Sequence, residues 1–156
     1  MLARSELPND LMDIFSPLDD IQYQYDWVIS DTDLYFAPDI SEEVRKRWFW
    51  TGLLMDGQEL TEQLSFGYVC FVAGGILSAV PKGTSGWQVR KYLPCWEIEK
   101  FGDPGYRFQT PLTQLEIICY DGYVWCVICK PEMPPVIQRA LPNAKTPDKF
   151  YRSMRS

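Results

Sequence analysis

Runs of apolar residues, some continuous and some alternating with polar positions, predict a chain built mainly from β-strands. The clearest pattern covers residues 115–129, where two apolar runs flank an Asp-Gly pair. Asp-Gly tolerates the positive φ angles of a tight type I′ turn, so these runs are expected to form a β-hairpin. With a two-residue loop, Ile118 would lie opposite Trp125. Because both faces of this hairpin are largely apolar, we expect it in the centre of a sheet.

Shorter patterns predict the other strands. Residues 25–30 and 34–37 alternate apolar and polar positions on either side of an Asp-Thr-Asp turn sequence, which favours a second hairpin. Apolar runs predict further strands at 48–55, at 66–80 with a bulge or turn at its Gly-Gly pair, and at 96–98 on a sheet edge.

Capping residues and one-face spacing predict short helices between the strands. Ser41 precedes two glutamates and then three basic residues, an order that the helix dipole favours, so a helix is expected through residue 47. Asp56 and Glu59 have the spacing of a capping box and predict a helix over 57–65. Further helices are expected at 10–16, 85–93 and 132–140. The pattern indicates an α+β fold, a mainly antiparallel sheet with a few short helices packed on one side.

Length and composition indicate one soluble domain. The 156 residues are expected to form a single domain, 1–156, with an aromatic-rich insertion at 84–114 and a basic tail at 142–156. No apolar run is long enough to span a bilayer, and the first residues lack a signal-peptide pattern. The five cysteines are odd in number and lie mostly in apolar runs, as is typical of reduced thiols. We therefore expect a cytoplasmic protein that does not bind membranes.

The sequence offers little catalytic or metal-binding chemistry. Histidine is absent, which excludes histidine-based nucleophile pairs, general bases and metal ligands. The Cys-x-x-Cys pair at 126 and 129 lies on a predicted strand without a second such pair, and the two aspartates at 31 and 33 lack a third carboxylate nearby. We predict no catalytic residues, no metal site and no cofactor.

Charge is distributed unevenly along the chain. Residues 1–43 carry eleven acidic residues and one basic residue, a net charge of −10, whereas residues 44–156 carry +4, which together give −6. An acidic N-terminal third opposes binding to nucleic acid and favours a cationic protein partner. The alternative is that these acids only keep the surface soluble.

Three stretches resemble a family of small bacterial cytoplasmic proteins. They are 15–36, with its Trp-containing strand after a short helix; 55–83, with an Asp-Gly-x-Glu-Leu helix before an aromatic strand; and 115–144, with an Asp-x-Tyr hairpin before a C-terminal helix. The family is an uncharacterised single-domain family, a domain of unknown function, and segment 84–114 departs from its pattern. In size, acidity and lack of a catalytic motif the chain is also similar to immunity proteins encoded beside bacterial toxins.

The leading hypothesis is a non-catalytic immunity protein or antitoxin that neutralises a cationic toxin domain by protein–protein interaction. Acidic residues would steer the partner, and aromatic residues would anchor it. The candidate partner-binding residues are Asp19, Asp20, Asp31, Asp33, Asp39, Trp87, Tyr92 and Trp96. The alternative for the three aromatic residues is a small satellite core beneath a long loop.

Two other functions stay open at the level of sequence. One is a small enzyme that uses carboxylate, Lys or Tyr chemistry, in which burial of Glu116 beside Trp125 would raise the pKa of the carboxyl group. Its alternative is a Glu116 exposed at a strand edge. The other is a regulatory domain that binds a small molecule in an aromatic-lined cavity between sheet and helices.

Overall fold

The computed structural model describes residues 2–5, 15, 21–49, 52–65, 69–92, 108, 110–120, 124–130 and 139. Its elements in chain order are β1 (Leu2–Ser5), the 3-10 helix η2 (Ile21–Gln24), β2 (Tyr25–Phe36), α2 (Glu42–Trp48), β3 (Leu53–Asp56), α3 (Gly57–Ser65), β4 (Val69–Pro81), α4 (Gly86–Lys91), β5 (Leu115–Tyr120) and β6 (Val124–Cys129).

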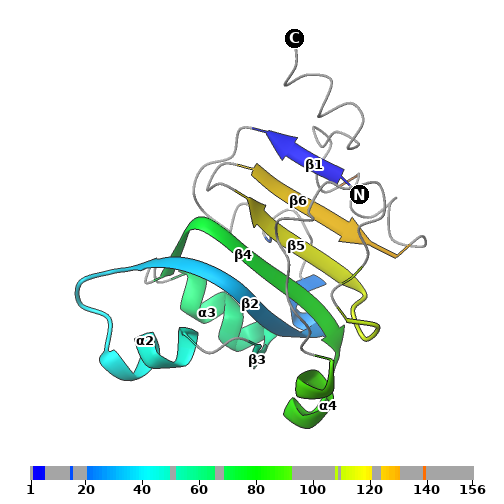
Figure 1. The fold of residues 1–156 in the computed structure, drawn as a ribbon, viewed down its shortest axis with the longest axis horizontal. Helices are drawn as coiled ribbons and strands as arrows, with labels where there is room; N and C mark the ends of the chain where they lie inside the picture. Colours follow the sequence, from blue (N-terminus) through cyan, green and yellow to red (C-terminus); the bar gives the residue numbers. More distant parts are fainter. Residues whose placement is uncertain are drawn as a thin grey trace.

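The described strands form one six-stranded antiparallel sheet (Figure 1). The strand order is β1-β6-β5-β4-β2-β3, so the hairpin β5–β6 lies inside the sheet with β1 and β4 as its neighbours. The α+β class, the mainly antiparallel sheet and the internal position of the 115–129 hairpin are therefore confirmed. β1 pairs with β6 although the two are far apart in sequence.

The predicted register of this hairpin is wrong by one residue. Ile118 pairs with Cys126, and Tyr120 pairs with Val124, so three residues rather than two lie between the paired ends. A shift of one residue moves every position of β6 to the opposite face of the sheet. Val127 accordingly joins the core cluster of Ile117, to which it is paired, instead of facing away from it.

The predicted hairpin at 25–37 is also wrong, because these residues form the single twelve-residue strand β2. Its partner is β4, which runs alongside it from Tyr25 opposite Pro81 to Phe36 opposite Val69. The Asp-Thr-Asp sequence forms an irregularity within the strand instead of a turn. β4 likewise continues through Gly74 and Gly75 and has its own irregularity next to them.

The capping patterns predicted the starts of the helices correctly, whereas the bounds of the strands were predicted less well. The Ser41 hydroxyl accepts a hydrogen bond from the Val44 amide and begins α2, and the Asp56 carboxylate accepts one from the Glu59 amide at the start of α3. α4 begins with a capping box between Ser85 and Gln88. The strand predicted at 48–55 is wrong in its first part, since Trp48 ends α2 and β3 begins only at residue 53.

The core lies mainly on one face of the sheet. Trp27, Ile29, Leu77 and Ile117 point to this face, where Leu60 of α3 packs against them. The opposite face carries a smaller cluster in which Val89 of α4 packs against Val28 and Val80. Helices therefore pack on both faces, which corrects the expectation of helices on one side only.

Several predicted elements fall outside the described residues. These are most of the helices at 10–16 and 132–140, the strand at 96–98, most of the insertion at 84–114, and the tail at 142–156. Phe15 is described, and it is helical and buried. Among the described helices, none is long and apolar enough to cross a membrane.

Candidate partner-binding surface

An irregularity in β2 determines which side chains its outer half, residues 31–36, presents. The β2–β4 ladder shifts register between Ser30 and Asp33, where β2 has one residue more than β4. Asp31 lies in this bulge with a φ of 48°. Aspartate tolerates this left-handed conformation better than β-branched residues do. Bulges bend a strand and re-aim the side chains that follow.

The bulge reverses the alternation of side chains along β2. Before it, Trp27 and Ile29 belong to the main core. After it, Leu34 and Phe36 pack there instead. Tyr35 consequently points to the opposite face and is 61% exposed. Without the extra residue, Tyr35 would lie on the same face as Trp27.

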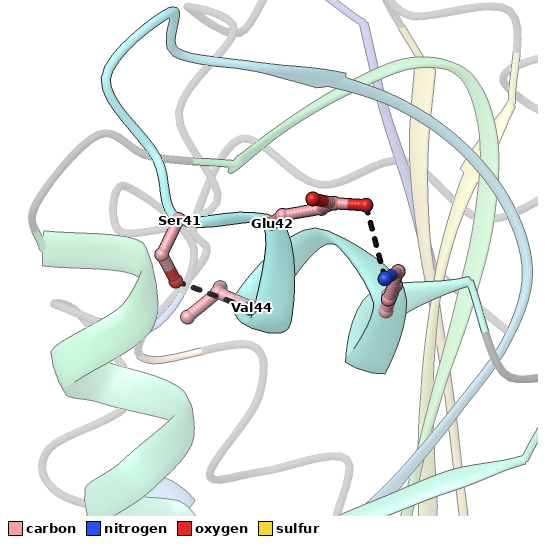
Figure 2. Close-up of polar contacts among 4 residues, drawn as sticks. Ser41, Glu42 and Val44 are labelled. Carbon is pink, nitrogen blue, oxygen red and sulfur yellow. Dashed lines mark hydrogen bonds and ion pairs between the residues drawn. The ribbon is translucent and has the colours of Figure 1, made fainter.

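Helix α2 packs beside the end of β2. Figure 2 shows its first turn, where Ser41 caps the helix and the Glu42 carboxylate lies beside an ammonium group. That group is Lys46 Nζ, 2.9 Å from Glu42 Oε1. The other two basic residues of the helix are also engaged. Arg45 donates to the Ala37 carbonyl oxygen over 3.1 Å, and Arg47 pairs with Glu59 of α3.

Three acidic residues in this region are exposed and have no ion pair within the described part of the chain. They are Asp33 on β2, Asp39 in the following loop and Glu43 in the first turn of α2. Lys46 and Arg47 pair with other carboxylates, whereas Arg45 donates to a neutral carbonyl oxygen and keeps its charge. Residues 31–49 nevertheless contain five acidic and three basic side chains, a net charge of −2. The surface therefore attracts cations.

An exposed phenylalanine lies on the other side of the end of β2. Phe49, directly after α2, is 71% exposed, and its ring centroid is 5.5 Å from that of the buried Phe36. Since Tyr35 and Phe36 point to opposite faces, Tyr35 and Phe49 flank this end of the strand from its two sides. Neither Tyr35 nor Phe49 was among the residues predicted to bind a partner. The Ser41 cap was the signal for Phe49, because a helix through residue 48 leaves residue 49 just beyond its end.

The predicted aromatic anchors lie elsewhere. Trp87 of α4 is 69% exposed, and Tyr92 follows the same helix. Lys91 Nζ lies 5.8 Å from the centroid of the Trp87 ring and 5.5 Å from that of Tyr92, so one cation contacts both rings. Arg90 and Lys82 are also exposed near this helix, which makes its surroundings basic rather than acidic.

The predicted partner-binding residues thus lie in two separate regions of the structure. Asp31, Asp33 and Asp39 lie at or beyond the bulge of β2. Trp87 and Tyr92 follow Pro81, which pairs with Tyr25 at the opposite end of that strand (Figure 1). Along the strand, Asp33 lies eight residues from Tyr25, roughly 25 Å. The remaining predicted residues, Asp19, Asp20 and Trp96, lie outside the described residues.

Glu116 is buried, not exposed at an edge. Its side chain accepts a hydrogen bond of 3.1 Å from the hydroxyl of Ser78, its partner on β4. The register places Glu116 opposite Ile128, whereas residue 125 pairs with Cys119. The burial that the enzyme hypothesis required is therefore present, but the register does not place residue 125 next to Glu116.

Other chemistry is sparse in the described residues. They contain no group of three or more Cys, Asp or Glu side chains placed to hold a metal ion. A shallow depression of about 380 Å³ lies between η2 and α3, lined by Tyr23, Gln58, Thr61, Glu62 and Ser65. Within it, the Gln58 amide donates to the Glu62 carboxylate over 3.0 Å.

Comparison with known proteins assigns no function to this surface. Neither protein-family models nor curated proteins nor solved structures gave a match to the chain.

Proposed function

We propose that this protein is a non-catalytic immunity protein or antitoxin that binds and blocks a cationic toxin domain. The observation that carries the proposal is the surface formed by the outer half of β2 and by α2. There, Tyr35 and Phe49 are exposed beside Asp33, Asp39 and Glu43, three carboxylates without ion pairs in the described residues. Resemblance in size and acidity to immunity proteins supports the choice of partner.

The carboxylates suit recognition of a basic surface. Enzymes that act on nucleic acid carry basic clefts, because these clefts bind phosphates. Complementary charge accelerates association and opposes the approach of acidic proteins. Binding through this surface is therefore expected to weaken as the salt concentration rises.

The two aromatic residues supply the apolar contribution. Interfaces derive most of their affinity from a few buried side chains, among which aromatic residues are enriched. Full burial of an aromatic side chain contributes on the order of 2 kcal/mol. Phe49 already rests on Phe36, so its ring is held in place before the partner arrives.

Growth rescue tests this function. The product of the neighbouring gene is expressed in a bacterial host with and without the protein, and we expect that product to stop growth and the protein to restore it. The double variant Tyr35→Ser/Phe49→Ser and the triple variant Asp33→Asn/Asp39→Asn/Glu43→Gln are expected to lose rescue while keeping the wild-type melting temperature. A wild-type protein that neither restores growth nor binds that product refutes the proposal.

Glu62→Gln provides a matched control for Glu43→Gln. Both glutamates are exposed on short helices, but Glu62 lies on α3, away from the end of β2. Each change removes one negative charge. Equal effects of the two changes on binding would mean that net charge, not this surface, governs recognition.

A further inference from the structure

The end of β4 and the whole of α4, residues 81–92, form a basic tip at the opposite end of β2 from the surface described above (Figure 1). These residues carry three basic side chains and no acidic one. Lys82, Arg90 and Lys91 are all exposed, and none of them has an ion pair within the described part of the chain. Arg90 Nε donates to the neutral Gly86 carbonyl oxygen over 3.2 Å, so the guanidinium keeps its charge.

Hydrogen bonds hold the backbone of the basic tip in place. The Gly83 amide donates to the Asp26 carboxylate over 2.7 Å, which ties the loop to β2. The amide and the hydroxyl of Thr84 both donate to the Pro81 carbonyl oxygen. A capping box then begins α4. The tip is therefore organised before a ligand binds, which lowers the entropy cost of binding.

Trp87 supplies one aromatic surface among these cations. Its side chain is 69% exposed, and Lys91 Nζ lies over one face of the ring, 5.8 Å from the centroid. Arg90, three residues further along the helix, lies on the same side of α4. Within residues 81–92, all of which the structure describes, Trp87 is the only exposed large apolar side chain. A single ring surrounded by cations lacks the apolar core that protein interfaces have.

We propose that the basic tip binds single-stranded nucleic acid, with one base stacked on Trp87 and the adjoining phosphates beside the three cations. Proteins that bind single strands combine a positively charged surface with aromatic side chains on which bases stack. Because every base has a flat face, little sequence preference is expected. This binding lies on a separate surface and goes beyond the proposed function.

The acidic residues at the other end of β2 do not prevent binding here. Asp33 lies eight residues along the strand from Tyr25, which pairs with Pro81 of the tip. That separation is roughly 25 Å, whereas salt screens exposed charges beyond about 8 Å under physiological conditions. The segment 82–107, which includes the residues that follow the tip in sequence, carries five basic and three acidic side chains, a net charge of +2.

Fluorescence anisotropy of a labelled oligonucleotide tests the proposal. The probe is a ten-residue oligothymidylate, titrated with the full chain at low salt. We expect binding that weakens with salt, with a slope of about −2 for log affinity against log salt concentration, because each of three phosphate contacts on a single strand contributes about −0.7. Lys82→Gln/Arg90→Gln is expected to reduce this slope to about −0.7.

Trp87→Ser is expected to weaken binding of the oligothymidylate about tenfold, the effect of removing one stacked ring. Trp87→Phe should retain most of the affinity, since a phenyl ring also stacks. Phe49→Ser is the matched control, because Phe49 is similarly exposed, at 71%, but lies among acidic residues at the other end of β2. We expect that variant to bind the oligonucleotide like wild type, and all three variants to keep the wild-type melting temperature.

Four results would overturn the inference. The first is no binding of the oligothymidylate at millimolar protein concentration, and the second is an equal loss of affinity in Phe49→Ser and Trp87→Ser. Equal competition by a ten-residue oligoglutamate would identify an acidic protein segment as the occupant. Tighter binding to phosphatidylserine vesicles than to the oligonucleotide would identify a membrane surface. None of these results affects growth rescue, which tests the proposed function separately.

Discussion

Replacing Gly57 with alanine is expected to destabilise the protein, although helix propensity predicts the opposite. Gly57 is the first residue of α3, after the capping Asp56. Its backbone is not among the described positions with positive φ, so glycine is not required there by conformation. Alanine at such a position ordinarily stabilises a helix by about 0.5–1 kcal/mol.

Packing around residue 57 reverses the sign of the expected change in stability. A Cβ atom at residue 57 would lie 1.9 Å from the backbone oxygen of Gln22, 2.6 Å from its carbonyl carbon and 3.0 Å from Tyr23 Cα. Relief requires η2 and α3 to separate by more than about 1 Å, because carbon contacts are comfortable at roughly 3.5–4 Å. The Gln22 oxygen also accepts the hydrogen bond of the buried Trp27 indole, 2.9 Å long. Separation would weaken this bond as well.

The two costs add to a large fraction of the stability of a typical domain. Overpacking costs about 1–3 kcal/mol, and an unpaired buried indole N–H costs about 1–3 kcal/mol more. We therefore expect Gly57→Ala to lower the free energy of unfolding by about 2–6 kcal/mol. For a chain of this length that corresponds to a melting temperature lower by roughly 5–20 °C.

Urea unfolding followed by tryptophan fluorescence, together with calorimetry, measures this change. Gly86→Ala is the matched control, because Gly86 is the first residue of α4 after the capping Ser85. There a Cβ atom would meet only the flexible end of Arg90, at 3.7 Å. We expect that variant to be within about 0.5 kcal/mol of wild type or more stable. Wild-type stability of Gly57→Ala would refute the reasoning, since the contact between η2 and α3 would then be looser than described.

Two further predictions concern β2. The Asp31→Gly variant is expected to be more stable than Asp31→Ala by about 1 kcal/mol, because only glycine accepts the positive φ at this position without strain. In a regular strand, alanine would be preferred instead. Chemical denaturation of both variants measures the difference, and the reverse order of stability would exclude the bulge. Trp27→Phe is expected to cost about 2–4 kcal/mol, because it removes the hydrogen bond to Gln22 and part of the edge-to-face contact with Phe15, whose ring centroid is 5.1 Å away; a loss below 1 kcal/mol in a thermal unfolding measurement would contradict that packing.

Local signals in the sequence predicted those features that depend on neighbouring residues. Ser41 and Asp56 begin α2 and α3 because a side chain three residues away from an amide can cap it wherever the helix lies. The apolar runs at 115–120 and 123–128 predicted an internal hairpin because strands that are apolar on both faces must be covered on both.

Features that depend on distant contacts were not predictable in this way. The Asp-Thr-Asp sequence suits either a turn or a bulge, and pairing with β4 along all of β2 selected the bulge. Because of this bulge, Tyr35 lies at the surface. The candidate site was predicted only in its acidic part, because the positions of Tyr35 and Phe49 follow from the bulge and from the end of α2.

By itself, therefore, the sequence determined where the helices begin, the class of fold and the excess of acid in the first third of the chain. Only the tertiary structure decided the hairpin register, the continuity of β2 and which aromatic residues accompany the acids. The physical reason is that a cap or an apolar run acts over a few residues. A one-residue shift in a strand is selected by the free energy of packing a whole face against elements far away in sequence.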